Sequence, residues 1–251
     1  MIIATILVRD EEDILEYTIE NIIRQGVGII VATDNGSKDD SRKILEKYKQ
    51  VKVIIDEPLF NHDQRAWVTR MAKIAVNYNP DWIVHIDSDE LWVGLNKLVY
   101  EDHQGYLKIP AIYQHPPVSH KDWNLELNKH CLKLGSLVGL SNTMPKVIHR
   151  SSKYVVIGNG NHTVSGCGEE KIIDYVEIHH YPVRTYNQFT RKVVQGAMAI
   201  LSQTDSAKSD AGNHWMQWYD SFNNNELPLV FENICSKCNV LINRGDMNVW
   251  K

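Results

Sequence analysis

The first 90 residues alternate between short apolar runs and longer segments with helical spacing, and this alternation restricts the fold more than any other feature. The apolar runs are residues 2–8, 28–33, 51–55 and 82–86. The segments with apolar residues at spacings of three and four are residues 14–23, 37–48 and 62–77. Near-continuous apolar strands are typical of sheets covered on both faces, and strand–helix alternation joins parallel strands by right-handed crossovers. We therefore predict an α/β fold with a Rossmann-like, mostly parallel central sheet flanked by helices.

Polar clusters follow three of the four predicted strands. They are Val8-Arg9-Asp10-Glu11, Asp34-Asn35-Gly36-Ser37 and Asp87-Ser88-Asp89-Glu90. Ligands of open α/β sheets bind beyond the carboxyl ends of the strands, so we expect the three clusters to share one rim of the sheet. If the fourth strand extends to Asp89, the carboxylates of Asp87 and Asp89 point to the same side. Two carboxylates at one point repel each other unless a cation lies between them, and oxygen ligands suit Mg²⁺ or Mn²⁺.

Two familiar phosphate-binding loops are absent from the sequence. No Gly-x-Gly-x-x-Gly follows the first predicted strand, and no Gly-x-x-x-x-Gly-Lys-Ser/Thr occurs anywhere. A dinucleotide-dependent dehydrogenase or a P-loop ATPase would therefore lack its phosphate cradle in this chain. A metal ion on Asp87 and Asp89 would meet the charge of a phosphate ligand instead.

The composition excludes several classes of protein. The 251 residues are 43% hydrophobic and 23% charged, which suits one sizeable globular core. The net charge of −4 and the lack of a basic stripe argue against nucleic acid as a partner. No apolar run reaches membrane-spanning length, and residues 1–8 lack the basic leader of a secretory signal. We expect a cytoplasmic protein with reduced cysteines, and leave open its association with a membrane surface and its oligomeric state.

The second half of the chain has a different pattern. Short β-like runs cover residues 106–113, 133–138, 146–157 and 171–178, and a helical segment follows at 186–203. Aromatic residues then continue into a tail. We predict a nucleotide-sugar-binding half at 1–99, an acceptor half with mixed strands and a closing helix at 100–204, and an extension at 205–251 packed on the body. Together these parts would form one structural domain.

The ordered set of motifs resembles a family 2-type glycosyltransferase with the GT-A fold. The three polar clusters carry this resemblance, together with Asp81-Trp82-Ile83 before the third of them. His180-Tyr181-Pro182-Val183-Arg184 resembles the later part of one branch of the group, which combines an Asp-x-Asp-Glu motif with a His-Tyr-Pro-x-Arg motif. The resemblance covers roughly residues 2–200. It implies transfer of a sugar from a nucleoside diphosphate-sugar to a hydroxyl of a carbohydrate or glycoconjugate acceptor, as in polysaccharide biosynthesis, with inversion at the sugar carbon.

The resemblance also implies roles for individual residues. Asp34 would hold the nucleotide base, and Asp87 would lie near the ribose. Asp89 would bind Mn²⁺ or Mg²⁺, and His180 would complete the metal shell with Asp87. The full set of nucleotide-binding candidates is Val8, Arg9, Glu11, Asp34, Asn35, Gly36, Arg65, Asp87 and Ser88.

Other polar residues are candidates with open roles. Arg65, at the start of a predicted helix, suits a phosphate, with an ion pair to Asp63 as the alternative. Glu90, Asp122 or another acid would serve as the catalytic base. The acceptor or phosphate candidates are Lys146, His162 and Arg184.

Two other functions remain in view. A nucleotidyltransferase acting on a sugar phosphate would use the same paired carboxylates, but would need a basic, Gly-rich loop where residues 9–12 are mostly acidic. A non-catalytic carbohydrate- or nucleotide-binding protein of the same fold would bind a nucleotide without turnover.

Overall fold

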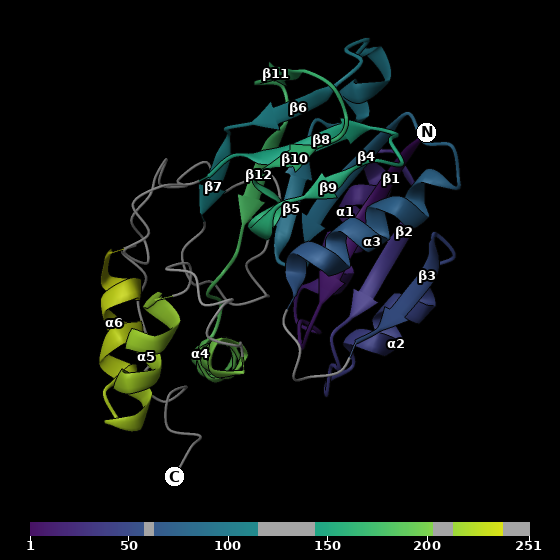
Figure 1. The fold of residues 1–251 in the computed structure, drawn as a ribbon. Coiled ribbons are helices and arrows are strands. Elements are labelled where there is room, and N and C mark those ends of the chain that lie inside the picture. Colours follow the sequence, from purple (N-terminus) through teal and green to yellow (C-terminus); the bar gives the residue numbers. More distant parts are fainter. Residues whose placement is uncertain (58–62, 115–143, 203–212, 238–251) are drawn as a thin grey trace. The chain divides into compact units, whose positions relative to one another are not determined.

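The computed structural model describes residues 1–57, 63–114, 144–202 and 213–237 (Figure 1). The chain divides into two compact units. The described residues up to Tyr113 and from 144 to His180 belong to the first unit, and those from Tyr181 onward belong to the second. The predicted run at 133–138 lies outside the described residues, as does the catalytic candidate Asp122.

The first unit contains a seven-stranded sheet in the order β11-β6-β8-β4-β1-β2-β3. Four neighbouring strands in it pair in parallel: β1 (Ile2–Val8), β2 (Val27–Asp34), β3 (Val51–Asp56) and β4 (Trp82–Asp87). In the register of β1, Val8 lies opposite Asp34 of β2, and Leu7 lies opposite Asp87 of β4. The carboxyl ends of these strands therefore share one edge, which confirms the predicted α/β fold with a mostly parallel central sheet.

Helices cover both faces of this sheet. Alternate residues of β1 point to opposite sides, as strand geometry requires. Ile2, Ala4 and Ile6 share a buried cluster with α1 (Leu15–Arg24) and α2 (Ser41–Lys47). Ile3 shares a second cluster with α3 (Gln64–Val76). Burial on both faces explains why the strands are continuously apolar.

Three strands from the later part of the chain extend the same sheet. They are β6 (Tyr106–Ile109), β8 (Lys146–Arg150) and β11 (Glu170–Ile172). Strand β8 is antiparallel to both β4 and β6, and Arg150 lies opposite Trp82 at the start of β4. The first residue of β8 therefore lies toward the carboxyl end of β4. The sequence placed these strands in the acceptor half, and the division at residue 99 stays a prediction about function.

The remaining strands of the first unit form two small sheets. One has the order β5-β12-β7, with β5 (Glu90–Val93), β12 (Glu177–His180) and β7 (Ile112–Gln114). The other pairs β9 (Val156–Ile157) with β10 (Val164–Ser165). Two 3₁₀ helices, η1 (Leu95–Tyr100) and η3 (Asn159–Asn161), complete the unit.

The described part of the second unit consists of three helices. They are α4 (Tyr186–Leu201), α5 (Asn213–Asn223) and α6 (Leu227–Lys237). Thr185 caps α4 by accepting a hydrogen bond from the backbone N–H of Gln188. Phe189 of α4 packs edge-on against Trp218 of α5, with ring centroids 5.2 Å apart. Within the described ranges, no helix combines the length and apolar character needed to cross a membrane.

Candidate active site at the carboxyl ends of the parallel strands

The turn between β4 and β5 carries the three carboxylates of the Asp-x-Asp-Glu motif. Strand β4 ends at Asp87, Ser88 and Asp89 form the turn, and Glu90 begins β5. The strand therefore stops before Asp89, and strand alternation does not relate Asp87 to Asp89. The turn itself places the carboxylates.

A polar stripe formed by two residues of α1 and its C-cap residue Gln25 holds this turn and the following strand β5 in place. The Oγ1 of Thr18 donates to the carbonyl of Ser88 at 2.7 Å, and the Oδ1 of Asn21 accepts from the N–H of Trp92 at 2.8 Å. The Oε1 of Gln25 accepts from the N–H of Gly94 at 3.0 Å. Spacings of three and four place these side chains on one face of the helix. They bind the backbone and leave the carboxylates of the turn for other partners.

Asp89 lies beside a histidine from a distant strand. Strand β12 is antiparallel to β5 and sets His180 opposite Glu90. The Nε2 of His180 is 3.4 Å from the Oδ1 of Asp89, and both side chains are largely buried. The neighbouring His179 instead stacks on Tyr113, with ring centroids 5.3 Å apart. Of the two adjacent histidines, His180 is therefore the one that joins the carboxylate cluster.

Lys146, the first residue of β8, lies inside the cluster. Its Nζ is 2.5 Å from the Oδ2 of Asp87 and 3.0 Å from the Oε1 of Glu90, and its side chain is only 6% exposed. Burial alone would lower the pKa of Lys146, but the two carboxylates outweigh burial and raise the pKa above its usual value. Lys146 is therefore an ammonium ion at neutral pH.

Glu90 is buried, with its Oε1 in the ion pair with Lys146 and its Oε2 hydrogen-bonded. Its side chain has no exposed surface. Its Oε2 accepts from the N–H of Asp87 and from the indole Nε1 of Trp92, both at 3.2 Å. Burial raises the pKa of Glu90, while Lys146 favours the ionised form. A carboxylate without exposed surface has no access to a substrate hydroxyl in this conformation, so the geometry suits Glu90 to positioning Lys146 and Asp87.

The loops after β1 and β2 are joined by hydrogen bonds. The N–H of Asp10 donates to the Oγ of Ser37 at 3.1 Å, and the Oδ1 of Asp10 accepts from the N–H of Lys38 at 2.5 Å. Asp10 has a φ of 52°, a left-handed conformation that aspartate adopts more readily than most residues. The N–H of Glu11 donates to the Oγ of Ser41 at 2.9 Å. These bonds unite the two loops along one rim of the sheet.

Asp34 and Asn35 lie at the centre of this joined pair of loops. The Oδ1 of Asp34 accepts from the N–H of Ser37 at 2.9 Å, and the N–H of Asn35 donates to the carbonyl of Val8 at 2.9 Å. Gly36 has a φ of 67°, which places the turn in the left-handed region. The structure therefore brings the predicted nucleotide-binding residues after β1 and β2 together.

Buried polar atoms without partners occur in this region. Among the described residues, the Nε of Arg9, the Oδ1 of Asn35 and the Oδ1 of Asn161 have no hydrogen-bond partner. Leaving such an atom unpaired costs about 1–3 kcal/mol, so each is suited to receive a group from a ligand. Burial lowers the pKa of Arg9 and Asp10 opposes this shift. A partly desolvated guanidinium favours an anionic partner.

His162 reaches the cluster from the loop at 158–162. Its Nδ1 lies 3.0 Å from the carbonyl oxygen of Pro145. A carbonyl only accepts, so Nδ1 carries the hydrogen and the Nε2 of the neutral ring is an acceptor. Burial lowers the pKa of His162, and the charge of Lys146 acts in the same direction. The ring packs closely against Gly160. A Cβ added at residue 160 would lie 2.4 Å from the Nε2 of His162, so only glycine leaves room for the ring.

The other predicted basic residues have different surroundings. Arg65 is exposed near the start of α3, and no ion pair or hydrogen bond of its side chain occurs among the described residues. Asp63 instead caps the helix by accepting from the N–H of Ala66. Arg184 belongs to the second unit, where its buried side chain donates to the carbonyl of Tyr181 at 2.8 Å. The phosphate roles of both arginines stay predictions.

The metal-binding capacity of the cluster is limited. No group of three or more His, Cys, Asp or Glu side chains is arranged to hold a metal ion in the described part of the chain. Asp89 and His180 lie together, whereas both oxygens of Asp87 are engaged by Lys146 and by the Nδ2 of Asn161 at 2.9 Å. One carboxylate and one imidazole fit Mn²⁺ or Mg²⁺ when phosphate oxygens and water fill the other positions.

Two features of the site were not predicted. Asn161 is one, and the polar stripe of Thr18, Asn21 and Gln25 is the other. The stripe has a detectable signal, because three polar residues at spacings of three and four interrupt an otherwise apolar face. The contact of Asn161 with Asp87 depends on a pairing 74 residues apart, for which we find no local signal.

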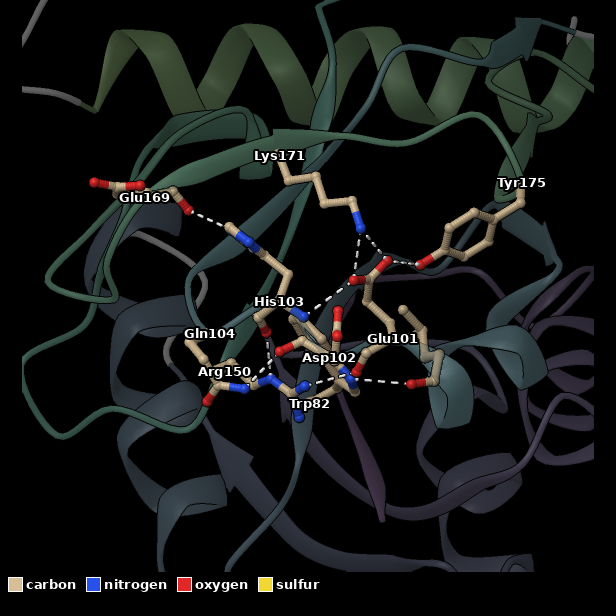
Figure 2. A network of polar contacts seen from close by, with 10 residues as sticks. Trp82, Glu101, Asp102, His103, Gln104, Arg150, Glu169, Lys171 and Tyr175 are labelled. Carbon is tan, nitrogen blue, oxygen red and sulfur yellow. Dashed lines mark hydrogen bonds and ion pairs between the residues drawn. The ribbon is translucent and has the colours of Figure 1, made fainter.

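A second polar network lies at the opposite end of β4 (Figure 2). The guanidinium of Arg150 stacks 4.0 Å from the ring centroid of Trp82. Its Nε donates to the carbonyl of His103 and its Nη2 to the carbonyl of Glu101, both at 2.7 Å. The carboxylate of Glu101 accepts from Lys171 Nζ and from the N–H of His103. The network fixes the segment at 101–104 against the sheet.

Comparisons with known proteins give only distant similarity. No protein-family model and no curated protein matches the chain. S. aureus TarS 1-349 has a TM-score of 0.44 and 12% identity, covering 89% of this chain and 73% of that chain. The structure of S. aureus TarS 1-349 in complex with UDP has a TM-score of 0.45 and 10% identity, covering 89% of this chain and 72% of that chain. A third similar structure is glucosyl-3-phosphoglycerate synthase from Mycobacterium tuberculosis in complex with Mn²⁺, UDP and glucosyl-3-phosphoglycerate. It has a TM-score of 0.31 and 15% identity, covering 46% of this chain and 44% of that chain. These TM-scores are below 0.5, so the functional assignment depends on the residues of this chain.

Proposed function

We propose that this chain is a GT-A glycosyltransferase that moves a sugar from a nucleoside diphosphate-sugar to an acceptor hydroxyl with the help of Mn²⁺ or Mg²⁺. The observation that carries the proposal is the arrangement along one sheet edge. The joined loops containing Asp34 and Arg9 end the adjacent strands β2 and β1, and Asp87 ends β4 on the other side of β1. Asp89 lies in the turn that follows β4, and His180 of β12 lies next to it.

The base of the nucleotide would bind at the end of β2. Asp34 and Asn35 offer buried oxygen acceptors there, and the Oδ1 of Asn35 lacks a partner among the described residues. Nucleobases present N–H donors on their edges, so this pair suits a base. The sequence resemblance assigns Asp34 the same role.

The ribose and diphosphate would lie between the base and the turn after β4. The side chain of Asp87 is 27% exposed, so its oxygens can accept from ribose hydroxyls in addition to Lys146 and Asn161. The buried Nε of Arg9 suits a phosphate oxygen. A divalent ion held by Asp89 and His180 would stabilise the negative charge that the diphosphate gains when the sugar bond breaks.

His162 suits the acceptor side of the reaction better than Glu90 does. A neutral imidazole whose Nδ1–H is fixed by Pro145 offers its Nε2 as a proton acceptor. Glu90 is enclosed by Trp92 and Lys146. His162 is therefore our choice for the group that removes the proton of the acceptor hydroxyl. Inversion at the sugar carbon rests on the sequence resemblance alone.

The nucleotidyltransferase alternative is less favoured by the loop after β1. A triphosphate needs free backbone N–H groups or basic side chains there. The N–H groups of Asp10, Glu11 and Glu12 instead donate to Ser37, Ser41 and Asp39.

The test is donor hydrolysis, because it needs no knowledge of the acceptor. A panel of nucleoside diphosphate-sugars is incubated with the protein, with Mn²⁺, with Mg²⁺ and with EDTA, and release of the nucleoside diphosphate is measured. We expect one donor to be cleaved in a metal-dependent manner. Binding of a donor without release of product under any condition, with or without added carbohydrate acceptors, would support a non-catalytic binding protein.

A further inference from the structure

The carboxylates of the turn after β4 form an unusually acidic group for a partly buried site. Asp87, Asp89 and Glu90 lie within four consecutive positions, and His180 is opposite Glu90 in the paired strand. Carboxylates this close repel one another, and a set of three with an imidazole would ordinarily attract a divalent cation from solution.

Lys146 already provides a cation at this place. Its Nζ contacts Asp87 and Glu90 at ion-pair distance, and two of its three donors are used there. The backbone of Lys146 is fixed, because β8 pairs with β6 and sets Lys146 opposite Ile109. The ammonium is therefore carried by a paired strand of the sheet, which holds it in contact with the two carboxylates.

The ion pairs divide the four potential ligands into two groups. Asp87 and Glu90 share Lys146, and Asn161 occupies the remaining oxygen of Asp87. Asp89 and His180 contact each other on the other side of the turn. Two protein ligands hold Mn²⁺ or Mg²⁺ weakly, because such ions need oxygen ligands from a bound phosphate to complete their shell.

We infer that Lys146 is a resident cation that withholds Asp87 and Glu90 from metal coordination, so that the divalent ion binds at Asp89 and His180 only together with a nucleoside diphosphate. This inference rests on the proposed function for the identity of the anionic ligand. It makes Lys146 a positioning residue, which sets the order of binding and keeps Asp87 available for the nucleotide.

The test removes the ammonium while keeping the length of the side chain. In Lys146→Met, Asp87 and Glu90 lose their cation and join Asp89 and His180 as ligands. We expect the affinity for Mn²⁺ alone, without nucleotide, to increase about ten-fold or more over the wild-type protein, as added carboxylates strengthen a cation site. Binding is measured from the electron paramagnetic resonance signal of free Mn²⁺ in a titration. No step of this assay requires turnover.

Two control variants separate the local effect from a general loss of positive charge. Lys108→Met removes an exposed lysine that pairs with Glu170, and we expect its Mn²⁺ affinity to equal that of the wild type. Lys146→Arg keeps the charge, and we expect no gain of Mn²⁺ binding. Circular dichroism confirms that each variant is folded.

Two results would overturn the inference. One is stoichiometric binding of Mn²⁺ to the wild-type protein without nucleotide, which needs no variant and therefore stands even if Lys146→Met fails to fold. The other is a folded Lys146→Met protein whose Mn²⁺ affinity is unchanged. Failure of the proposed function gives a different result: no nucleoside diphosphate would bind the wild-type protein in the presence of Mn²⁺. This result does not depend on how the wild type and Lys146→Met bind Mn²⁺ alone.

Discussion

Strand β8 carries a cation at each end, Lys146 buried and Arg150 partly exposed, and the two cations have different kinds of partner. Arg150, at the end of the strand, stacks on Trp82 and donates to backbone carbonyls of the segment at 101–104 (Figure 2). Within the described part of the chain, Lys146, at the start, contacts the side-chain carboxylates of Asp87 and Glu90. The backbone carbonyls bound by Arg150 cannot move away unless the segment unfolds. The carboxylate side chains bound by Lys146 can rotate and bind a ligand instead.

The comparison separates a structural network from a candidate active site. Both ends of β8 hold a charged side chain in several polar contacts, so such contacts alone do not identify function. The end at Arg150 satisfies its donors with fixed carbonyls. The end at Lys146 contacts the partly exposed Asp87 and lies toward the carboxyl ends of the parallel strands, the rim where α/β sheets bind ligands. Among the described residues, the Nε of Arg9 and the Oδ1 of Asn35, which follow β1 and β2, have no hydrogen-bond partner. Changes at the two ends should therefore affect different properties, which the following predictions test.

The largest effect is expected from Asp89→Ala. Loss of the carboxylate should lower metal-dependent release of the nucleoside diphosphate about 10²–10³-fold, since the site then loses charge stabilisation of the leaving group. The melting temperature should change little. Glu177→Ala is the matched control, because Glu177 forms a carboxylate–imidazole pair with His179 on the same strand, 3.7 Å apart. Equal loss in both variants would contradict a specific role for Asp89.

Arg150→Ala should instead lower the free energy of unfolding, by about 2–4 kcal/mol. It removes a cation–π contact with Trp82 and leaves the partly buried carbonyls of Glu101 and His103 without these donors. Urea denaturation followed by circular dichroism measures this change. Arg42→Ala, which breaks exposed ion pairs with Glu46 and Asp56, should cost less than about 1 kcal/mol. A similar cost in both variants would show that the Arg150 network contributes little to stability.

Asp34→Ala should weaken binding of the nucleoside diphosphate about ten-fold, whether or not Mn²⁺ is present, because the base pocket loses an acceptor but the metal ligands remain. Isothermal titration calorimetry measures both affinities. Asp56→Ala removes an aspartate at the end of the neighbouring strand, where Asp56 lies opposite Asp34, and should leave the affinity unchanged. A loss that appears only with Mn²⁺ would place Asp34 at the metal and not at the base.

The smallest effect is a pH dependence at Glu101. Burial would raise the pKa of Glu101, but hydrogen bonds from Lys171, His103 N–H and Tyr175 outweigh it and lower the pKa from 4.5 to about 2. A depressed folded-state pKa contributes stability that is complete above pH 4.5 and is lost as the pH falls toward 2. Glu101→Gln should therefore be less stable than the wild type at pH 7, with the difference shrinking between pH 4.5 and 2. A constant difference in denaturation midpoint over this range would contradict the assignment.

The parallel strands β1, β2 and β4 were predictable because each is largely buried on both faces. The expected strand at residues 2–8 is β1, and the strand at 82–86 differs from β4 by one residue. Helix α1 likewise differs from its expected range by one residue at each end. In these segments local periodicity and tertiary burial agree, which is the condition under which a sequence pattern determines an element.

The less predictable features depend on contacts between distant residues. The second helical segment was expected to begin at residue 37, but α2 begins at Ser41 and the Oγ of Ser37 accepts a hydrogen bond from the N–H of Asp10. Lys146 was expected as an acceptor or phosphate candidate, and its ion pairs with Asp87 and Glu90 were not predicted. It is buried because β8 joins the central sheet next to β4, and this pairing has no local signal.

The most direct test of the donor site is thermal stabilisation by nucleoside diphosphates. A ligand that binds only the folded state raises the melting temperature, and at a concentration of 100 Kd it adds about 2.7 kcal/mol of stability. We predict that one member of a panel of UDP, GDP, ADP, CDP and dTDP raises the melting temperature of the wild-type protein, and that Mn²⁺ enhances this shift while Mn²⁺ alone produces none. If no nucleoside diphosphate shifts the melting temperature, with or without Mn²⁺, the carboxyl ends of β1, β2 and β4 are not a donor-binding site.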